Sequence, residues 1–201
     1  MPSPLLLATT NPGKLAELRA LLRRTGADLK DLRQVGIEIE VPEEGADYAE
    51  NAVAKSIAYA RASGLWTLAD DTGLEVDALG GAPGLRSARL AGDDAARRAG
   101  LLQQLGRHPP PWTARFRCAV ALASPGGDTA VGEGECQGEI IPVARGENGF
   151  GYDPLFVVAG TGQTMAELSF DVKNRLGHRA GAVEDLLSRL RRGALPSFPR
   201  A

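Results

Sequence analysis

Short apolar runs alternate along the chain with longer stretches of helical periodicity, and the first such pair opens the sequence. Residues 4–9 form an apolar run typical of a buried strand, and leucines then recur at positions 15, 18, 21 and 22. Between them, Asn11 suits a helix N-cap and Pro12 the first helical position, where proline's missing N–H would have no intrahelical partner anyway. The pattern predicts a strand, a turn and an amphipathic helix.

A second helix and strand follow further along. Small and apolar residues at helical spacing predict a helix over about 48–63, with Asp47 near its start and Gly64 just past its end. Residues 65–69 then predict a buried strand that ends in Asp70-Asp71. Ligands of α/β proteins bind at the carboxyl ends of strands, which makes these aspartates candidates for a site. Because side chains alternate in an extended chain, the two point in opposite directions, and we favour Asp71.

The remaining patterns predict a hairpin and a final helix. Alternation over 113–124 and a returning strand over about 129–143 indicate antiparallel scaffold, and an apolar stripe from Ala182 to Leu190 indicates the last helix. Strands mixed with helices in this order are typical of an α/β fold. We therefore expect one domain over 1–192 and a flexible C-terminal tail over 193–201.

Composition narrows the class of protein further. The chain has 201 residues, a net charge of −2 and a pI near 5.8, which gives no reason to expect a nucleic acid polymer as partner. Cys118 and Cys136 match no zinc or redox spacing and are interpreted as reduced core thiols. No apolar run approaches the roughly 18 residues of a membrane span, and no signal peptide opens the chain. We expect no membrane association and a cytoplasmic location.

The start of the first helix is the first candidate site. A helix N-terminus carries partial positive charge and attracts phosphate, and Lys14 adds a full charge one turn in. The alternative is simply a well-capped helix, and the segment is not a Walker loop, which requires GxxxxGK followed by Ser or Thr. The residues of this candidate triphosphate cradle are Thr9, Thr10, Asn11, Pro12, Gly13 and Lys14.

Two further groups carry candidate chemistry. Asp71, with Glu43 or Glu44 as a second carboxylate, is suited to a hard cation, although Asp70-Asp71 could also form a plain turn. The glycine-flexed loop 149–154 presents aromatics that could stack on a base or close over the core. Three cations near the start of the last helix oppose its dipole, which favours an anionic or oxygen-rich ligand over a solvated patch. These later residues are Phe150, Gly151, Tyr152, Asp153, Lys173, His178 and Arg179.

Taken together, these elements resemble the inosine triphosphate pyrophosphatase-like enzymes, which remove non-standard purine nucleotides. The likeness spans nearly the whole chain and depends on the order of its motifs, since any one of them would be weak. The matching segments are 8–14, Glu50-Asn51-Ala52 with Lys55, 69–74, 79–84 with Ser87-Ala88-Arg89, 149–154 and 173–179.

The resemblance implies a long mixed sheet flanked by helices, two lobes around a central substrate cleft, and a homodimer. It implies a magnesium-dependent reaction in which ITP, dITP or XTP yields the monophosphate and pyrophosphate. Thr9 to Lys14 would hold the triphosphate, Asp71 would be general base and, with Glu43, magnesium ligand, and Thr72 would touch substrate. Phe150 to Asp153, Lys173, His178 and Arg179 would surround the nucleoside.

Selection among purine bases can be explained by hydrogen bonding. Hypoxanthine and xanthine present a 6-oxo acceptor where adenine presents an amino donor, so donors from His178, Arg179 and nearby amides would favour the oxo bases. The family usually places serine before the His-Arg pair, where this chain has Gly177. Two rival functions remain open: a related pyrophosphatase with another base preference, and a nucleotide sensor without catalysis, which the crowded carboxylates disfavour in the absence of a metal.

Overall fold

The computed structural model describes residues 4–88, 92–193 and 195, and within these ranges the chain forms a mixed α/β fold. One sheet has the strand order β2-β1-β3-β5-β6-β7, with β4 paired to β3. Strand β1 runs parallel to β2 and β3, whereas β4 and β7 are antiparallel to their neighbours. The strands are β1 (Pro4–Leu7), β2 (Asp28–Asp31), β3 (Trp66–Val76), β4 (Pro83–Gly84), β5 (Trp112–Ala123), β6 (Thr129–Ile140) and β7 (Phe156–Val158).

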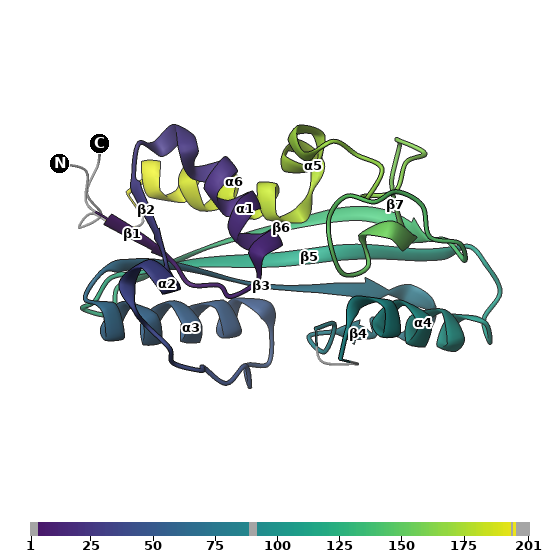
Figure 1. The fold of residues 1–201 in the computed structure, drawn as a ribbon, viewed down its shortest axis with the longest axis horizontal. Helices are drawn as coiled ribbons and strands as arrows, with labels where there is room; N and C mark the ends of the chain where they lie inside the picture. The colour runs from purple at the N-terminus through teal and green to yellow at the C-terminus, as the bar shows by residue number, and fades with distance from the viewer. Residues whose placement is uncertain (1–3, 89–91, 194, 196–201) are drawn as a thin grey trace. The chain divides into compact units, whose positions relative to one another are not determined.

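Helices flank this sheet, as expected for the predicted fold class (Figure 1). None of the helices in the described ranges has the length and apolar character that a membrane crossing requires. The α-helices are α1 (Pro12–Leu22), α2 (Leu32–Val35), α3 (Tyr48–Ser63), α4 (Asp94–Leu105), α5 (Phe170–Leu176) and α6 (His178–Arg191), with 3-10 turns at Arg23–Thr25, Asp77–Leu79 and Asp153–Leu155.

The chain divides into two compact units, each assembled from separate segments. The first contains Met1–Asp71, Cys118–Gly134 and Arg179–Ala201, and the second contains Thr72–Arg117 and Glu135–His178. Each unit has a hydrophobic core of its own. The central cleft implied by the family resemblance concerns the arrangement of these units and stays a prediction.

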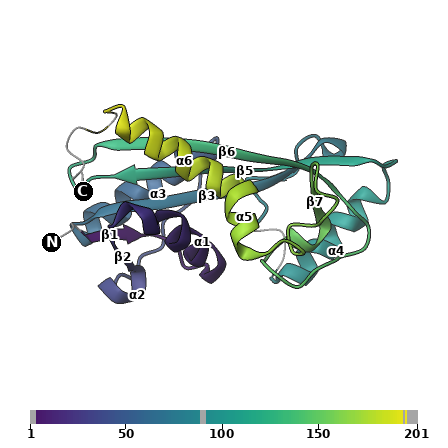
Figure 2. The same cartoon turned by 90° about the horizontal axis from the view of Figure 1, so that it is seen from above.

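In the first unit, the residues of β1 alternate between two apolar clusters. Leu5 and Leu7 pack with α1 and α6 on one face of the sheet, whereas Leu6 and Ala8 pack with Tyr59 of α3 on the other. Figures 1 and 2 show α1 and α6 on the same side of the strands and α3 on the opposite side. This two-sided burial explains the continuous apolar run at the start of the sequence.

Several boundaries match the sequence prediction, whereas the predicted strands over 4–9, 65–69 and about 129–143 end at other residues. The helix over 48–63 and the cap at Asp47 are confirmed, since the Asp47 side chain accepts a hydrogen bond from the Glu50 N–H. The predicted strand over 65–69 was too short, because β3 continues through the aspartates to Val76. Leu74 and Val76 are buried in the second unit, which keeps the chain extended beyond Gly73.

The second unit is built around α4, β7 and the outer parts of the long strands. Leu101 and Leu105 of α4 pack in its core with Phe116 and Phe156. The predicted C-terminal tail falls largely on residues 194 and 196–201, which lie outside the described part of the chain. Leu195, however, is buried in the core of the first unit.

Candidate functional site

The segment after β1 forms the capped helix start that the sequence predicts. The Asn11 side chain accepts from the Lys14 N–H at 3.0 Å, and Pro12 is the first helical residue. Thr9 Oγ1 accepts from the Asn11 N–H at 3.2 Å, while Thr10 is exposed and Gly13 half-buried. The first turn of a helix leaves N–H groups without intrahelical partners, so this end of α1 is suited to an anion.

The two aspartates lie in the middle of β3, beyond the point where its parallel neighbour β1 ends. Leu7, the last residue of β1, is opposite Leu68 in β3, which places Asp70 and Asp71 level with the segment that leads into α1. Asp70 shares a face of the strand with Leu68, and Asp71 shares the other face with Ala69. Leu68 belongs to the cluster of α1 and α6 and Ala69 to that of α3, so the two carboxylates meet different helices.

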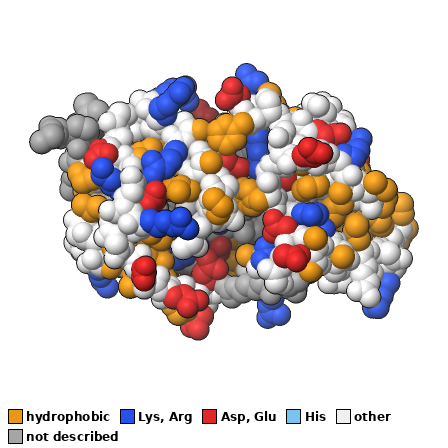
Figure 3. All heavy atoms as spheres, in the orientation of Figure 1, with side chains coloured by type: hydrophobic (Ala, Val, Ile, Leu, Met, Phe, Trp, Pro, Cys, Tyr) orange, Lys and Arg blue, Asp and Glu red, His pale blue; other side chains and the backbone are white. Residues whose placement is uncertain are grey.

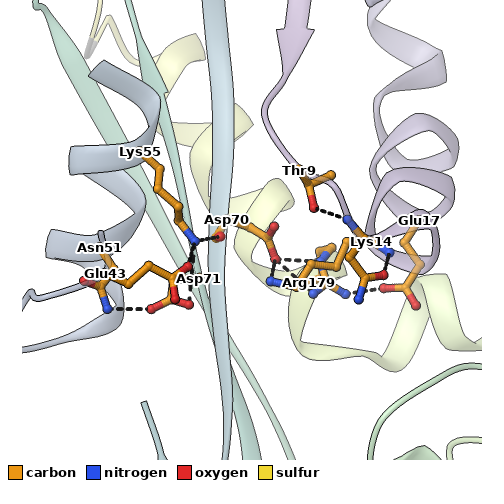
Figure 4. Close-up of polar contacts among 10 residues, drawn as sticks. Thr9, Lys14, Glu17, Glu43, Asn51, Lys55, Asp70, Asp71 and Arg179 are labelled. Carbon is orange, nitrogen blue, oxygen red and sulfur yellow. Dashed lines mark hydrogen bonds and ion pairs between the residues drawn. The ribbon is translucent and has the colours of Figure 1, made fainter. Parts of the chain in front are cut away.

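Asp70 is the centre of a buried ion network. Its Oδ2 accepts from Arg179 Nη2 at 2.9 Å and lies 3.0 Å from Lys14 Nζ, while Arg179 also pairs with Glu17 (Figure 4). Burial alone would raise the pKa of Asp70, but the charges of Lys14, Arg179 and Lys55 hold this pKa well below its usual value. Asp70 is therefore a permanent anion that orders two cations.

Asp71 has the opposite electrostatic character. Its Oδ2 accepts from Asn51 Nδ2 at 2.8 Å, and its Oδ1 lies 3.8 Å from Lys55 Nζ. Burial raises the pKa of Asp71, and the Lys55 charge and the Asn51 hydrogen bond only partly oppose it. A carboxylate whose proton affinity is raised is a better general base than a fully solvated one.

Glu43 completes the group on this side of β3. Lys55 Nζ donates to Glu43 Oε1 and, at 2.7 Å, to the backbone carbonyl of Asp70 (Figure 4). Glu43 is half-buried and faces the same ammonium group as Asp71, whereas Glu44 is exposed. A cationic side chain between two carboxylates shows that this pair attracts positive charge.

The carboxylates of Asp71 and Glu43 are the residues best placed to hold a metal ion. Within the described ranges, no group of three or more His, Cys, Asp or Glu side chains is suited to a metal. An all-protein cage is therefore not formed by these residues. Two carboxylates fit Mg²⁺, which usually keeps several waters and binds through one or two carboxylates together with substrate phosphates.

The second unit contains a separate group built on the loop 149–153. Asp153 Oδ2 accepts from the Phe150 N–H at 2.9 Å and from Lys173 Nζ, and this ammonium lies 4.7 Å from the Phe150 ring centroid. Gly149 has φ 79°, and a Cβ there would lie 2.1 Å from Asp153 Oδ2. Only glycine therefore allows this loop to close on Asp153.

Two expected nucleoside contacts are core residues in this unit. Tyr152 is 4% exposed and its hydroxyl donates to the Ser87 carbonyl, so its ring packs in the core. His178 is also 4% exposed and stacks on Phe116 with ring centroids 4.7 Å apart. The contact of Tyr152 and His178 with substrate stays a prediction. For Tyr152, the position of the ring agrees with the alternative that the aromatics of this loop close over the core.

The structure thus divides the predicted site residues between the two units. Asp71, Glu43 and the segment from Thr9 to Lys14 lie in the first unit, while Thr72, Lys173, His178 and the loop Phe150 to Asp153 lie in the second. Arg179, expected beside the nucleoside, belongs to the first unit, where it is 1% exposed and bound to Asp70 and Glu17. Its contact with substrate stays a prediction.

Sequence reasoning did not assign roles to Glu17, Asn51 and Lys55, which contact the site groups of the first unit. Glu17 lies three residues after Lys14 on α1, and Asn51 and Lys55 are four residues apart on α3. Helical spacing places such pairs on one face, so this periodicity was the available signal. Gly177, which stands where the family usually has serine, closes α5 by donating its N–H to the Lys173 carbonyl.

The first unit combines a helix N-terminus that carries a lysine with buried carboxylates that can hold a hard cation. These features are typical of an α/β protein that acts on phosphate groups. The chain belongs to the Ham1 family, whose model matches residues 5–189. This finding confirms the resemblance inferred from the ordered motifs.

Individual relatives agree with this assignment. The dITP/XTP pyrophosphatase of Bacillus subtilis is 45% identical over 185 residues, covering 90% of this chain and 93% of its own. A solved structure of a HAM1 protein from Coxiella burnetii is 35% identical, covers 95% of this chain and 100% of its own, and superposes with a TM-score of 0.84. The nucleoside-triphosphatase/dITP/XTP pyrophosphatase of Mycobacterium abscessus is 42% identical, with coverages of 94% and 97% and a TM-score of 0.70.

Proposed function

We propose that this protein hydrolyses non-standard purine nucleoside triphosphates such as ITP, dITP and XTP to the monophosphate and pyrophosphate. The observation that carries the proposal is Asp71, a buried carboxylate of raised pKa that shares Lys55 with Glu43. On the other face of the same strand, Asp70 fixes Lys14 at the start of α1. The names of the relatives support the substrate class.

The triphosphate would be bound by the start of α1. Lys14 and the first-turn amides supply positive charge where negative charge accumulates on the phosphate oxygens during the reaction. Asp70 keeps the Lys14 ammonium in one place, so little reorganisation is needed when the transition state forms. The same groups would stabilise the pyrophosphate as it leaves.

Asp71 would orient and deprotonate the water that attacks the α-phosphorus. The Asn51 amide holds one carboxylate oxygen, which fixes the direction of the other. We propose that Mg²⁺ is the cofactor, held by Asp71 and Glu43, and that when bound it neutralises charge on the phosphate oxygens. The fit of the two carboxylates to a hard cation supports this assignment.

The nucleoside would be recognised by residues of the second unit. The Lys173 ammonium can only donate hydrogen bonds, so it suits a 6-oxo acceptor and mismatches the amino group of adenine. Asp153 orders Lys173 and the Phe150 amide together. This arrangement supports preference for inosine- and xanthosine-type bases over ATP.

The decisive experiment identifies the products. The purified protein is incubated with ITP and Mg²⁺, and IMP, pyrophosphate and orthophosphate are quantified separately, with EDTA and the Asp71→Asn variant as controls. IMP and pyrophosphate in equal amounts are expected. Orthophosphate with IDP would place the cleavage at a different bond, and tight ITP binding without a magnesium-dependent product would favour the nucleotide sensor.

A nucleotide panel tests the base preference. Initial rates with ITP, XTP and dITP are expected to exceed those with ATP, dTTP and UTP. Equal turnover of ATP and ITP would remove the proposed selection by the 6-oxo group, and faster turnover of a pyrimidine nucleotide would identify the related pyrophosphatase with another preference.

We also propose a homodimer and a cytoplasmic location, both on the strength of the family resemblance. Light scattering coupled to size exclusion tests the dimer, and a monomer at micromolar concentration would contradict it.

Net charge is only −2, and acidic and basic side chains are interspersed on the face shown in Figure 3. This charge distribution gives no support to a nucleic acid polymer as partner.

A further inference from the structure

The Asn51 side chain connects the acidic loop to the strand that carries Asp71. It is 1% exposed, its Oδ1 accepts from the Gly45 N–H at 2.7 Å, and its Nδ2 donates to Asp71 Oδ2 at 2.8 Å. An N–H can only donate and a carboxylate can only accept, so the two partners fix the amide in one orientation. Figure 4 shows Asn51 directed at Asp71 from α3.

The loop that carries Glu43 is held by three side chains of α3. Glu50 accepts from the Ala46 N–H at 2.8 Å, Asn51 binds the Gly45 N–H, and Lys55 pairs with Glu43 itself. Asn51 also donates a hydrogen bond to Asp71, so it joins the loop and the strand to one rigid helix. Residue 51 therefore links the position of the loop to the position of the general base.

Gly45 shows how closely this connection is fitted. A Cβ at Gly45 would lie 2.8 Å from both Asn51 Oδ1 and Glu50 Cβ, and 3.0 Å from the Asn51 N atom. These neighbours belong to a buried amide and to the helix, so the loop would have to move rather than the neighbours. A methyl group at position 45 thus perturbs the same connection from the loop side.

We propose that Asn51 is a positioning residue that sets the separation and orientation of Glu43 and Asp71, and so determines the affinity of this pair for a divalent cation. The inference rests on the proposed function in that it assigns the cation to these two carboxylates. It goes further by naming the group that aligns them before metal or substrate arrives.

The test measures metal binding without nucleotide. Mn²⁺, used as the probe, is titrated into wild type, Asn51→Ala, Gly45→Ala and the control Gly100→Ala, and bound metal is followed by electron paramagnetic resonance. Asn51→Ala and Gly45→Ala should each weaken Mn²⁺ binding by about tenfold or more, as is typical when the support of a metal ligand is removed. A Cβ added at Gly100 would meet nothing within 4 Å, so this variant should bind like wild type.

Two further readouts distinguish positioning from a general structural role. Hydrogen exchange of the amides in residues 43–46 should accelerate in Asn51→Ala, and the Mg²⁺ concentration for half-maximal activity should rise more than the KM for ITP. Variants that melt at lower temperature yet bind Mn²⁺ with wild-type affinity would overturn the inference. If Asn51→Ala does not fold, Gly45→Ala alone decides, because it keeps the Asn51 side chain.

The outcome also separates this inference from the proposed function. Wild-type turnover of ITP with unchanged Mn²⁺ affinity in both variants would reject the role of Asn51 and leave the activity intact. A wild-type protein that neither binds Mn²⁺ nor releases pyrophosphate would reject both.

Discussion

Asp70 and Asp71 are neighbours in sequence, yet only the substitution of Asp70 should lower stability. Asp70→Asn removes the buried carboxylate that Arg179 and Lys14 share, which should lower the free energy of unfolding by about 3 kcal/mol. Asp71→Asn removes a carboxylate whose ionisation is opposed by burial, so stability should stay the same or increase. Denaturant unfolding of the two variants measures both effects, and equal destabilisation would contradict the contrast.

The pH dependence of these differences follows from the two pKa shifts. The pKa of Asp70 is lowered in the folded protein, so its contribution is present above the unfolded value of about 3.9 and is lost as pH falls through the folded value. The pKa of Asp71 is raised, so wild type loses stability relative to Asp71→Asn as pH rises through that pKa. Unfolding curves of metal-free wild type and Asp71→Asn, measured between acidic and neutral pH, should show this change in their stability difference.

The same two residues should separate catalysis from binding. Asp71→Asn keeps the size of the side chain but cannot accept the proton of the attacking water, so kcat should fall by at least about a hundredfold. The groups proposed to bind the triphosphate are unchanged, so the dissociation constant for ITP should remain within a fewfold of wild type. Single-turnover and equilibrium binding measurements check this, and near wild-type kcat would remove Asp71 from its role.

Residue-scale features were predictable from sequence where they depend on local geometry. Alternation along an extended chain was enough to separate Asp70 from Asp71, and the caps at Asn11 and Asp47 followed from residue type. The partners of Asp70 were not predictable in the same way. Arg179 is 109 positions from Asp70 and 162 from Glu17, and only the packing of α1 against α6 brings them together.

At the scale of elements, the errors of sequence reasoning arise where tertiary packing overrides a local turn signal. Asp70-Asp71-Thr72-Gly73 reads as the end of a strand, but β3 continues because Leu74 and Val76 are buried and β4 pairs beside them. The short helix α5 was not predicted, because its sequence signal is weak. It has only seven residues, and its strongest signal is the Ser169 cap.

Helix α4 should support the loop 149–153, which is proposed to recognise the nucleoside, although α4 was not among the predicted site elements. Asp94 accepts from the Gly151 N–H and Arg98 donates to the Gly151 carbonyl, both at 2.7 Å, so α4 holds both sides of this residue. Asp94→Ala and Arg98→Ala each remove one such bond, worth about 1 kcal/mol, and kcat/KM for ITP should fall about fivefold.

The matched control for this prediction lies on the same helix. Gln103 of α4 is exposed, and Gln103→Ala should leave kcat/KM unchanged. A loss of thermal stability in the Asp94 and Arg98 variants with unaltered kinetics would show that α4 is only scaffold. A rise in KM with kcat preserved is the expected pattern for a group that positions the loop 149–153.

At the scale of the whole molecule, each unit contains one buried thiol, and the reactivity of that thiol can be used to measure the stability of its unit. Cys118 lies in the first unit and Cys136 in the second, and both are buried. Burial, with a contribution from Asp153, raises the pKa of Cys136 to about 11, so only about one thiol in a thousand is ionised at pH 8. Since the thiolate is the reactive form, native Cys136 should be labelled very slowly.

Two single-cysteine proteins make this measurable unit by unit. Cys136→Ala leaves the thiol of the first unit and Cys118→Ala that of the second, and a disulfide reagent should react with each only as its own unit opens. Both should react at once in denaturant, which is the control for accessibility. If ITP and Mg²⁺ slow labelling of one thiol more than the other, the ratio identifies the unit that the ligand stabilises more. Rapid stoichiometric labelling of native protein would contradict the interpretation of both cysteines as core thiols.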